Sequence, residues 1–293
     1  MKTYKYNYKV YKLIKLCKLI ILVLFLLNHK YIISKDIISI IIPTYNREKY
    51  ILNSIKSVLN QTYNNIEIIV IDDCSTDNTK SEISKIKDRR IRYIKLNNNN
   101  GAAYARNFGI KLAKGKYISF QDSDDIYHYD KLKEQLSNLN RYKSDLDFCK
   151  ISVTINNNTT YYVPDNITEN KILNGDIYDE LLCNGNFIST QSILVKKSFV
   201  EKYLFDIRFP RLQDFDLILR IIPNIKVSFT NKVLVSLYRQ NDSISSSPIK
   251  LKESISLLLN KNYNLNFTQK KKFFNYLNCL KKTLRKEYKL VIK

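Results

Sequence analysis

The segment Tyr117–Asp125, YISFQDSDD, joins an apolar, strand-like run to three carboxylates within four residues. Carboxylates this close repel one another, so their pKa values rise unless a cation neutralises them. Hard oxygen ligands at the end of a strand suit Mg²⁺ or Mn²⁺, which keep several waters and share their coordination with substrate phosphates. An acidic turn that only ends the strand is the simpler interpretation of an isolated DSDD. The neighbouring sequence therefore has to decide between a metal site and a turn.

Short β-branched runs alternate with amphipathic stretches on the N-terminal side of this segment. The expected strands are 37–42, 66–71, 91–96 and 117–120. The expected helices are 51–59, a polar helix that follows the capping residues 75–77 and runs to about 87, and 101–113. Crossovers of about a dozen residues or more specify a largely parallel sheet covered by helices, so the predicted fold class is α/β. Ligands of such sheets bind beyond the carboxyl ends of the strands. Three polar segments lie there, Pro43–Tyr45, Asp72–Asp73 and Asp122–Asp125.

The second half of the chain is less regular. We expect helices at 132–139, 214–222, 250–260 and 268–290, a helix that opens at 196–199, and strands at 146–155, 187–195, 226–230 and 233–238. Residues 156–160 form a polar hairpin or loop. The last two helices are basic and amphipathic, and their lysines face either a membrane or water.

Composition limits the kinds of site that this chain can build. The net charge of +22 would ordinarily indicate nucleic acid or an anionic membrane as a partner. Lys, Asn, Ile and Tyr are abundant while Gly, Pro and Trp are scarce, a pattern typical of A/T-rich coding that raises lysine content without a binding role. The 5 cysteines form no CxxC pair and there are 2 histidines, so neither a zinc site nor a disulfide framework is indicated. Any metal must be held by carboxylates.

The first 36 residues differ from the rest. Six lysines precede the uninterrupted apolar run Leu19–Leu27. A basic flank and a short apolar core fit a signal peptide or signal-anchor better than a spanning helix of about 20 residues. An amphipathic arm that lies on the membrane or on the domain is the alternative. We expect three parts, 1–36, 37–245 and the basic C-terminal helices 246–293, in a membrane-associated protein that is otherwise cytoplasmic and is single-pass if the anchor spans.

Five motifs occur in order along the chain. They are IIIPTYN (40–46), VIDDCSTD (70–77), GAAYARN (101–107), DSDD (122–125) and LQDFD (212–216). Each is weak alone, but the five in this order and spacing resemble family 2 glycosyltransferases over about residues 37–240. The resemblance implies a GT-A fold, which is a Rossmann-like, mixed and mainly parallel sheet flanked by helices. It also implies an inverting transferase with a nucleotide-sugar donor.

The resemblance assigns nucleotide-sugar binding to the first four motifs. Tyr45 can stack on a base and Asp73 can accept a hydrogen bond from a base N–H, and the family places a uracil-type base between these positions. Arg106 lies on a helix from which its guanidinium can reach the nucleotide, although an exposed helix-surface arginine is the alternative. The candidate nucleotide-sugar residues are Pro43, Tyr45, Asp73, Arg106, Asp122 and Ser123.

The resemblance further implies a metal ligand and a catalytic base. Asp122 would lie near the ribose or the metal, and Asp124 would coordinate the Mn²⁺ or Mg²⁺ that bridges the diphosphate. Such a cation stabilises the negative charge that develops on the leaving nucleoside diphosphate. Inverting transfer also needs a carboxylate to take the proton of the acceptor hydroxyl. The matched residue is Asp214, for which helix N-capping is the alternative role.

Two positions depart from the family pattern. The usual Glu-Asp pair is Gln213-Asp214 here, which leaves Asp216 as a weaker candidate base, since two residues along a helix it points to a different face. Many relatives carry a histidine after the Tyr-Arg pair, and none follows Arg239 in this chain. Either Gln240 or Asn241 replaces it, or the site relies on Asp124 and phosphate oxygens.

These features predict an enzyme of polysaccharide or glycan biosynthesis, a hexosyltransferase-type glycosyltransferase. It would move a sugar from a nucleotide-sugar, foremost a UDP-sugar, to an acceptor hydroxyl with inversion and with Mn²⁺ or Mg²⁺. The acceptor, whether glycan, lipid-linked or protein, stays open, and no nucleic-acid partner is expected. The alternatives are a nucleotide-sugar-binding protein without turnover and a basic module for membranes or nucleic acid, which would leave the acidic clusters unexplained.

Overall fold

A nine-stranded sheet runs through the described part of the chain, residues 36–155, 159–165, 167–169, 172, 177–239 and 247–291 of a computed structural model. Its strands are β1 (Ile38–Thr44), β2 (Ile66–Asp72), β3 (Ile91–Lys95), β4 (Tyr117–Phe120), β5 (Ile126–Tyr127), β6 (Leu146–Ile155), β7 (Thr159–Val163), β8 (Ile193–Lys196) and β9 (Val227–Arg239). The strand order is β3-β2-β1-β4-β8-β6-β9-β5, with β7 paired to β6.

Strand direction decides which ends meet at one edge of the sheet. Strands β1, β2, β3, β4, β6 and β9 run in one direction, and β5, β7 and β8 run in the other. The sheet is therefore mixed and mainly parallel, as the sequence predicts. The carboxyl ends of the six strands share one edge with the amino end of β8, and the residues that follow or precede these ends come together there.

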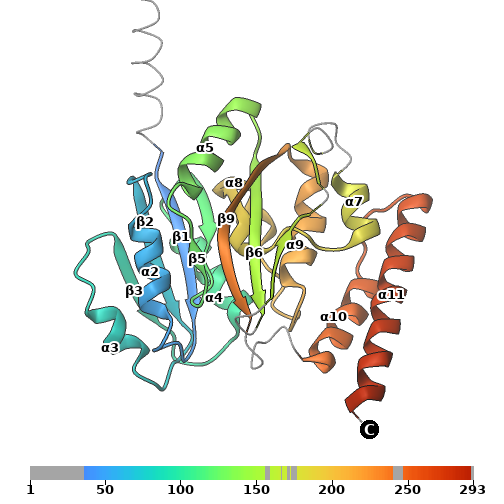
Figure 1. Ribbon diagram of the computed structural model, residues 1–293, viewed down its shortest axis with the longest axis horizontal. Coiled ribbons are helices and arrows are strands. Elements are labelled where there is room, and N and C mark those ends of the chain that lie inside the picture. The colour runs from blue at the N-terminus through green and yellow to red at the C-terminus, as the bar shows by residue number, and fades with distance from the viewer. Residues whose placement is uncertain are drawn as a thin grey trace, which may run out of the picture. The chain divides into compact units, whose positions relative to one another are not determined.

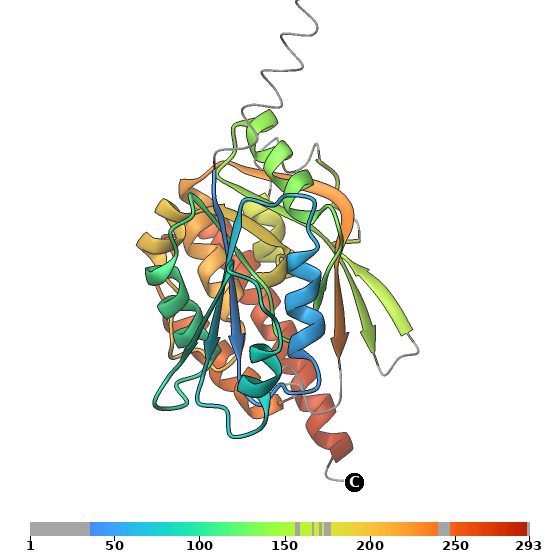
Figure 2. The ribbon, with the colours of Figure 1, turned by 90° about the vertical axis from the view of Figure 1, so that its left-hand side faces the viewer.

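Helices cover both faces of the sheet (Figures 1 and 2). They are α2 (Ile51–Leu59), α3 (Thr79–Ser84), α4 (Ala102–Leu112), α5 (Lys131–Tyr142), α7 (Ile177–Asn184), α8 (Lys197–Tyr203), α9 (Gln213–Ile221), α10 (Pro248–Asn260) and α11 (Phe267–Val291). Helices α2, α3 and α5 share one buried cluster with the sheet. Helices α4 and α7 to α11 share the other. The apolar residues at helical spacing in α2, such as Ile51, Ile55 and Val58, are the ones that are buried.

The contact between α4 and β1 depends on a glycine. A Cβ atom added at Gly109 would lie 2.5 Å from Cγ2 of Ile41, closer than side chains can approach. Every residue of β1 is buried, since helices pack on both of its faces. Gly109 thus lets α4, the helix that carries Arg106, pack closely against β1. The carboxyl end of β1 lies at the candidate site.

Several boundaries differ from those predicted. The strand predicted at 187–195 contains only Ile193–Lys196, because a 3₁₀ turn, η1 (Thr190–Ser192), precedes it. The two strands predicted at 226–238 are one strand, β9, with an irregular register where Thr230 and Val233 pair with neighbouring residues of β6. The polar helix predicted after the capping residues 75–77 is α3; Asp77 Oδ1 accepts the backbone N–H of Thr79 at 3.0 Å, and the helix ends at Ser84 rather than near residue 87. The sequence did not predict the two-residue strand β5.

Two predicted features lie outside the described residues. These are the N-terminal segment up to residue 35 and the stretch Gln240–Ser245 after the Tyr-Arg pair. Across the described ranges, none of the helices is long and apolar enough to cross a membrane.

A buried polar network lies between α5 and the sheet. The ammonium group of Lys131, which is fully buried, donates to Ser119 Oγ at 3.1 Å and to Gln135 Oε1 at 2.7 Å. The Gln135 amide in turn donates to Asp147 Oδ1 at 3.1 Å. Burial lowers the pKa of Lys131 to about 8 and raises that of Asp147 to about 7. The network satisfies groups that would be costly to bury unpaired, and it holds β4, β6 and α5 together beneath the acidic motif.

Replacing Asp147 tests this burial through the pH dependence of stability. The pKa of Asp147 is raised from 3.8 to about 7, so the folded state binds more protons than the unfolded state across this window, and stability falls as pH rises through it. One such proton accounts for a slope of at most about 1.4 kcal/mol per pH unit. Asp147→Asn should reduce the slope of the unfolding free energy between about pH 4 and 7, measured by denaturant unfolding.

The control is Asp88→Asn. Its hydrogen bond with Arg90 lowers the pKa of Asp88 from 3.8 to about 2, so its contribution is lost only as pH falls below this window. Asp88→Asn should therefore keep the wild-type slope. An unchanged slope in Asp147→Asn would contradict the assignment.

Candidate active site

The candidate site residues lie at the edge where the carboxyl ends of the parallel strands meet. The loop Tyr45–Asn46 follows β1, Asp73 follows β2, and Asp122–Asp125 follows β4. Helix α4 brings Arg106 to this edge, and α9 begins there with Gln213 and Asp214. The structure thus gathers residues from five motifs that are spread over about 170 residues of sequence.

Asp73 fixes the loop that starts α4. Its two carboxylate oxygens accept the backbone N–H groups of Asn100 at 2.8 Å and Gly101 at 2.7 Å. Gly101 adopts φ 89°, a left-handed conformation that glycine accepts without steric cost. The carboxylate is 3% exposed, so in this structure its bonds are to the protein backbone. Tyr45, in the loop after β1, is 43% exposed.

Arg106 connects the acidic motif to the start of α9. Its Nη2 donates to Asp122 Oδ1 at 2.7 Å, and its Nη1 donates to Gln213 Oε1 at 3.1 Å. The guanidinium stacks over the Phe205 ring with a distance of 5.5 Å to the centroid. Arg106 is 7% exposed, which excludes the helix-surface arginine that the sequence left open. A buried charge of this kind is stabilised only while its partners stay in place.

Gln191 joins two carboxylates of the acidic motif and was not predicted from the sequence. Its Nε2 donates to Asp122 Oδ2 at 2.6 Å and to Asp125 Oδ2 at 2.7 Å. Burial raises the pKa of Asp125 well above its usual range, and the charges of Asp122 and Asp124 raise it further. The available signal was the polar run Ser189–Ser192, four residues that interrupt an otherwise apolar stretch.

Asp124 has the chemistry that a divalent cation requires. Among the three carboxylates of the motif, Asp122 and Asp125 are held by Arg106 and Gln191, whereas the Asp124 side chain is 36% exposed. Its Oδ2 lies 3.6 Å from Nε of Arg47, a residue that directly follows the first motif. No group of three or more acidic, histidine or cysteine side chains in the described ranges forms a metal cage. One carboxylate therefore fits a cation that takes its other ligands from water and phosphate.

Asp214 lies at the second position of α9. Its Oδ1 accepts the backbone N–H of Phe215 at 2.8 Å. Burial raises the pKa of Asp214, the Phe215 bond and the charge of Arg106 lower it, and the charge of Asp122 raises it. The neighbouring Gln213 also donates from Nε2 to the carbonyl oxygen of Phe209 at 2.9 Å, which a glutamate at this position could not do.

Asp216 is not part of this group of residues. It is fully buried and binds Arg220 at 2.7 Å, Lys261 at 2.6 Å and the Tyr263 hydroxyl at 2.8 Å. These contacts tie α9 to the segment between α10 and α11. Asp216 therefore faces away from Arg106, in line with its position two residues along the helix.

The remaining candidates are buried. Pro43 is a buried residue of β1, and Ser123 is 6% exposed within the turn after β4. Both shape the backbone of the site. The structure thus places all the predicted site residues at one edge of the sheet, and Arg47, Gln191 and Gln213 join them.

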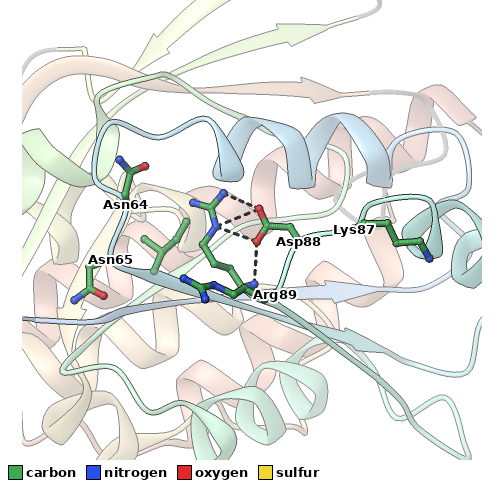
Figure 3. Close-up of a pocket in the computed structure, with 7 residues that line it drawn as sticks. Asn64, Asn65, Lys87, Asp88 and Arg89 are labelled. Atoms are coloured by element: carbon green, nitrogen blue, oxygen red, sulfur yellow. Dashed lines mark hydrogen bonds and ion pairs between the residues drawn. The ribbon is translucent and has the colours of Figure 1, made fainter.

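A pocket lies at the opposite edge of the sheet (Figure 3). It is lined by Asn64, Asn65, Ile66, Lys87, Asp88, Arg89 and Arg90. They lie at the amino ends of two strands: Asn64 and Asn65 precede β2, Ile66 begins it, and residues 87–90 precede β3. An ion pair between Asp88 and Arg90 at 2.8 Å occupies it, and none of the motif residues reaches it.

The comparisons with known proteins agree with this geometry. The sequence profile described as Glycosyl transferase family 2 matches residues 39–204. The chain is 35% identical over 220 residues to the UDP-Glc:alpha-D-GlcNAc-diphosphoundecaprenol beta-1,3-glucosyltransferase WfgD of Escherichia coli. The matched region covers 73% of this chain and 81% of WfgD.

Solved structures share the fold. S. aureus TarS in complex with UDP-GlcNAc superposes with a TM-score of 0.67 at 24% identity, over 82% of this chain and 71% of the other. The mannosyltransferase PcManGT of Pyrobaculum calidifontis, in complex with GDP-Man and Mn²⁺, superposes with a TM-score of 0.57 at 16% identity, over 77% and 64%. The predicted GT-A type of fold is confirmed.

Two substitutions at Gln191 separate the lost amide from an added charge. Gln191→Met removes a donor shared by Asp122 and Asp125, and the expected loss in unfolding free energy is about 1–3 kcal/mol at pH 8. Gln191→Glu loses the same donor and adds a third carboxylate, so it should be less stable than Gln191→Met at pH 8. Protonation relieves this repulsion, and the gap should narrow at pH 5.5. Denaturant unfolding at both pH values measures the difference in unfolding free energy between the two variants. A difference that stays the same or widens at pH 5.5 would contradict the role of Gln191 as a donor shared by Asp122 and Asp125.

Proposed function

The chain belongs to glycosyl transferase family 2, and on that premise we propose that it moves a sugar from a UDP-sugar to an acceptor hydroxyl with inversion. It is a glycosyltransferase that uses a nucleotide-sugar donor. The observation that carries the finer proposal is the position of Arg106, which hydrogen-bonds both Asp122 and Gln213. One guanidinium thereby joins the acidic motif to Gln213, the residue that directly precedes the candidate base Asp214.

The donor nucleotide would bind at the carboxyl ends of β1 and β2. Tyr45 offers an exposed ring to a base, and Asp73 can accept a base N–H with the lone pairs that its backbone bonds leave. Pro43 and Ser123 would shape the backbone against which the nucleotide lies. WfgD uses UDP-Glc according to its name, and TarS was solved with UDP-GlcNAc, which supports a uridine donor here.

Asp124 would hold the divalent cation, Mn²⁺ or Mg²⁺. When bound, such a cation stabilises negative charge on the leaving diphosphate. The presence of Mn²⁺ in the PcManGT complex supports this choice. Asp122 would stay with Arg106 near the ribose, because both of its oxygens already accept hydrogen bonds from the protein.

Asp214 would act as the general base. Burial raises its pKa, which makes its carboxylate a better proton acceptor, while the guanidinium of Arg106 favours the ionised form that a base must have. Asp214 stands at the start of α9, directly after Gln213, which accepts a hydrogen bond from Arg106. Transfer would then be a single displacement in which the acceptor hydroxyl attacks as Asp214 takes its proton.

A lipid-linked acceptor is the class that the relatives favour. WfgD, by its name, acts on a GlcNAc carried by diphosphoundecaprenol. We propose the same class of acceptor here, with membrane association through the basic N-terminal segment. The protein would then work on polysaccharide precursors at the membrane surface.

A second candidate function is nucleotide-sugar binding with little turnover. The observation that favours it is Gln213, since a neutral amide stands where the family usually has a glutamate. Binding of UDP without sugar release across a panel of UDP-sugars would support this candidate over transfer.

Two substitutions test the assigned roles. Asp214→Asn cannot take a proton, so the rate of transfer from a UDP-sugar should fall about 10²- to 10⁴-fold while donor affinity is kept. Asp124→Asn should abolish both activity and its dependence on Mn²⁺. Activity is measured as UDP release with and without acceptor, and donor binding by calorimetry.

The control is Asp88→Asn, which changes a carboxylate at the opposite edge of the sheet and should leave activity intact.

In the wild type, the rate should fall as pH decreases through the raised pKa of Asp214, because protonation removes the base. Wild-type rates in both Asp124→Asn and Asp214→Asn would refute the role assignments.

A further inference from the structure

Helix α11 has two contrasting faces. Phe273 and Leu277 are buried in the core. On the solvent-facing side of the helix Phe267 is 86% exposed and Phe274 is 55% exposed, far more than large apolar side chains usually are. The exposed lysines of this face are Lys270, Lys271, Lys281 and Lys282. Spacings of three, four and seven residues place Phe267, Lys270, Lys271 and Phe274 on one stripe of the helix.

The stripe is cationic as well as aromatic. Residues 267–282 contain no Asp or Glu. Asp179 of α7 binds Lys272 at 2.7 Å and Gln269 at 3.2 Å on the flank of the helix, and the charge of Glu180 also raises the pKa of Lys272. The described contacts therefore neutralise Lys272 and leave the lysines of the stripe facing outward.

The buried face of α11 packs against the start of α9. The Phe215 ring lies 5.9 Å from the Tyr276 ring and 6.2 Å from the Phe273 ring, measured between centroids. Phe215 directly follows the candidate base Asp214, and the charge of Asp214 acts on the Tyr276 hydroxyl. Figure 1 shows α10 and α11 together beyond α9. The exposed stripe therefore lies about one helix diameter, about 10 Å, from the element that carries the base.

We propose that this stripe of α11 docks the enzyme on an anionic lipid bilayer. Phe267 and Phe274 would enter the boundary between head groups and acyl chains, and the lysines would extend their ammonium groups to lipid phosphates. The inference rests on the proposed function, since a lipid-linked acceptor stays in the bilayer and has to meet Asp214 from that side. A convex helix face with two apolar rings suits a bilayer better than single-stranded nucleic acid, which binds in basic grooves that follow its backbone.

The chain contains no tryptophan, so a single introduced tryptophan reports its own surroundings. Full-length Phe274→Trp is mixed with vesicles of phosphatidylcholine with one third phosphatidylglycerol, and with pure phosphatidylcholine vesicles. On the anionic vesicles we expect a blue shift of the emission and quenching by brominated acyl chains. The matched control is Tyr129→Trp, at a side chain 66% exposed on another part of the surface, which should show neither. This contrast separates docking through α11 from adsorption through the N-terminal segment.

Charge removal completes the test. The four lysines Lys270, Lys271, Lys281 and Lys282 are then replaced by Gln in the Phe274→Trp protein. The concentration of anionic lipid that gives half of the emission shift should rise at least about tenfold. UDP-sugar hydrolysis without acceptor should stay unchanged in this variant, so failure of the proposed activity and failure of docking are distinguishable. No shift on anionic vesicles, equal shifts in both tryptophan variants, or a shift with RNA but not with vesicles would overturn the proposal.

Discussion

The site depends on one buried guanidinium. Arg106 is held between Asp122, which lies in the turn after β4, and Gln213, which begins α9. The turn and α9 cannot separate without leaving a buried charge unpaired. Its Nε has no hydrogen-bond partner among the described protein atoms, which makes the two remaining contacts more important. Breaking a buried ion pair by removing one partner typically costs about 3–5 kcal/mol. The same bonds that stabilise the fold therefore position the groups proposed for donor binding and for proton transfer.

Strained backbone positions and a second charged cluster lie around this contact. Asn46, Cys74 and Leu212 adopt positive φ angles of 52°, 72° and 57°, and each adjoins a site residue. Such conformations persist where surrounding contacts determine them, and they gather at functional sites. Asp216 anchors the other face of α9 to the C-terminal helices. Helix α9 thus joins the edge of the sheet that carries the candidate site to α11, which carries the surface proposed to meet the membrane.

Patterns local in sequence predicted much of this molecule. The β-branched runs that became β1 and β2 are buried on both faces, and an apolar run of that kind allows few other structures. The motif segments after β1, β2 and β4 also lie beyond the carboxyl ends of those strands, as their positions in the sequence predicted. Contacts between distant residues could not be predicted: Gln191 lies 69 residues from Asp122, and the polar stretch around it does not show which residues it contacts. The use of both Asp73 oxygens by backbone N–H groups depends on the conformation of a loop, which its sequence does not specify.

The central claim is that Arg106 and Asp122 act as a unit in transfer. A double-mutant cycle with Arg106→Met and Asp122→Asn, read out as kcat/KM for transfer from a UDP-sugar, tests it most directly. Residues that act together are strongly non-additive, so the double variant should be little worse than the worse single variant, with a coupling of about 1–3 kcal/mol. Losses that add to within about 0.5 kcal/mol would show that the two residues act independently, and would contradict the account.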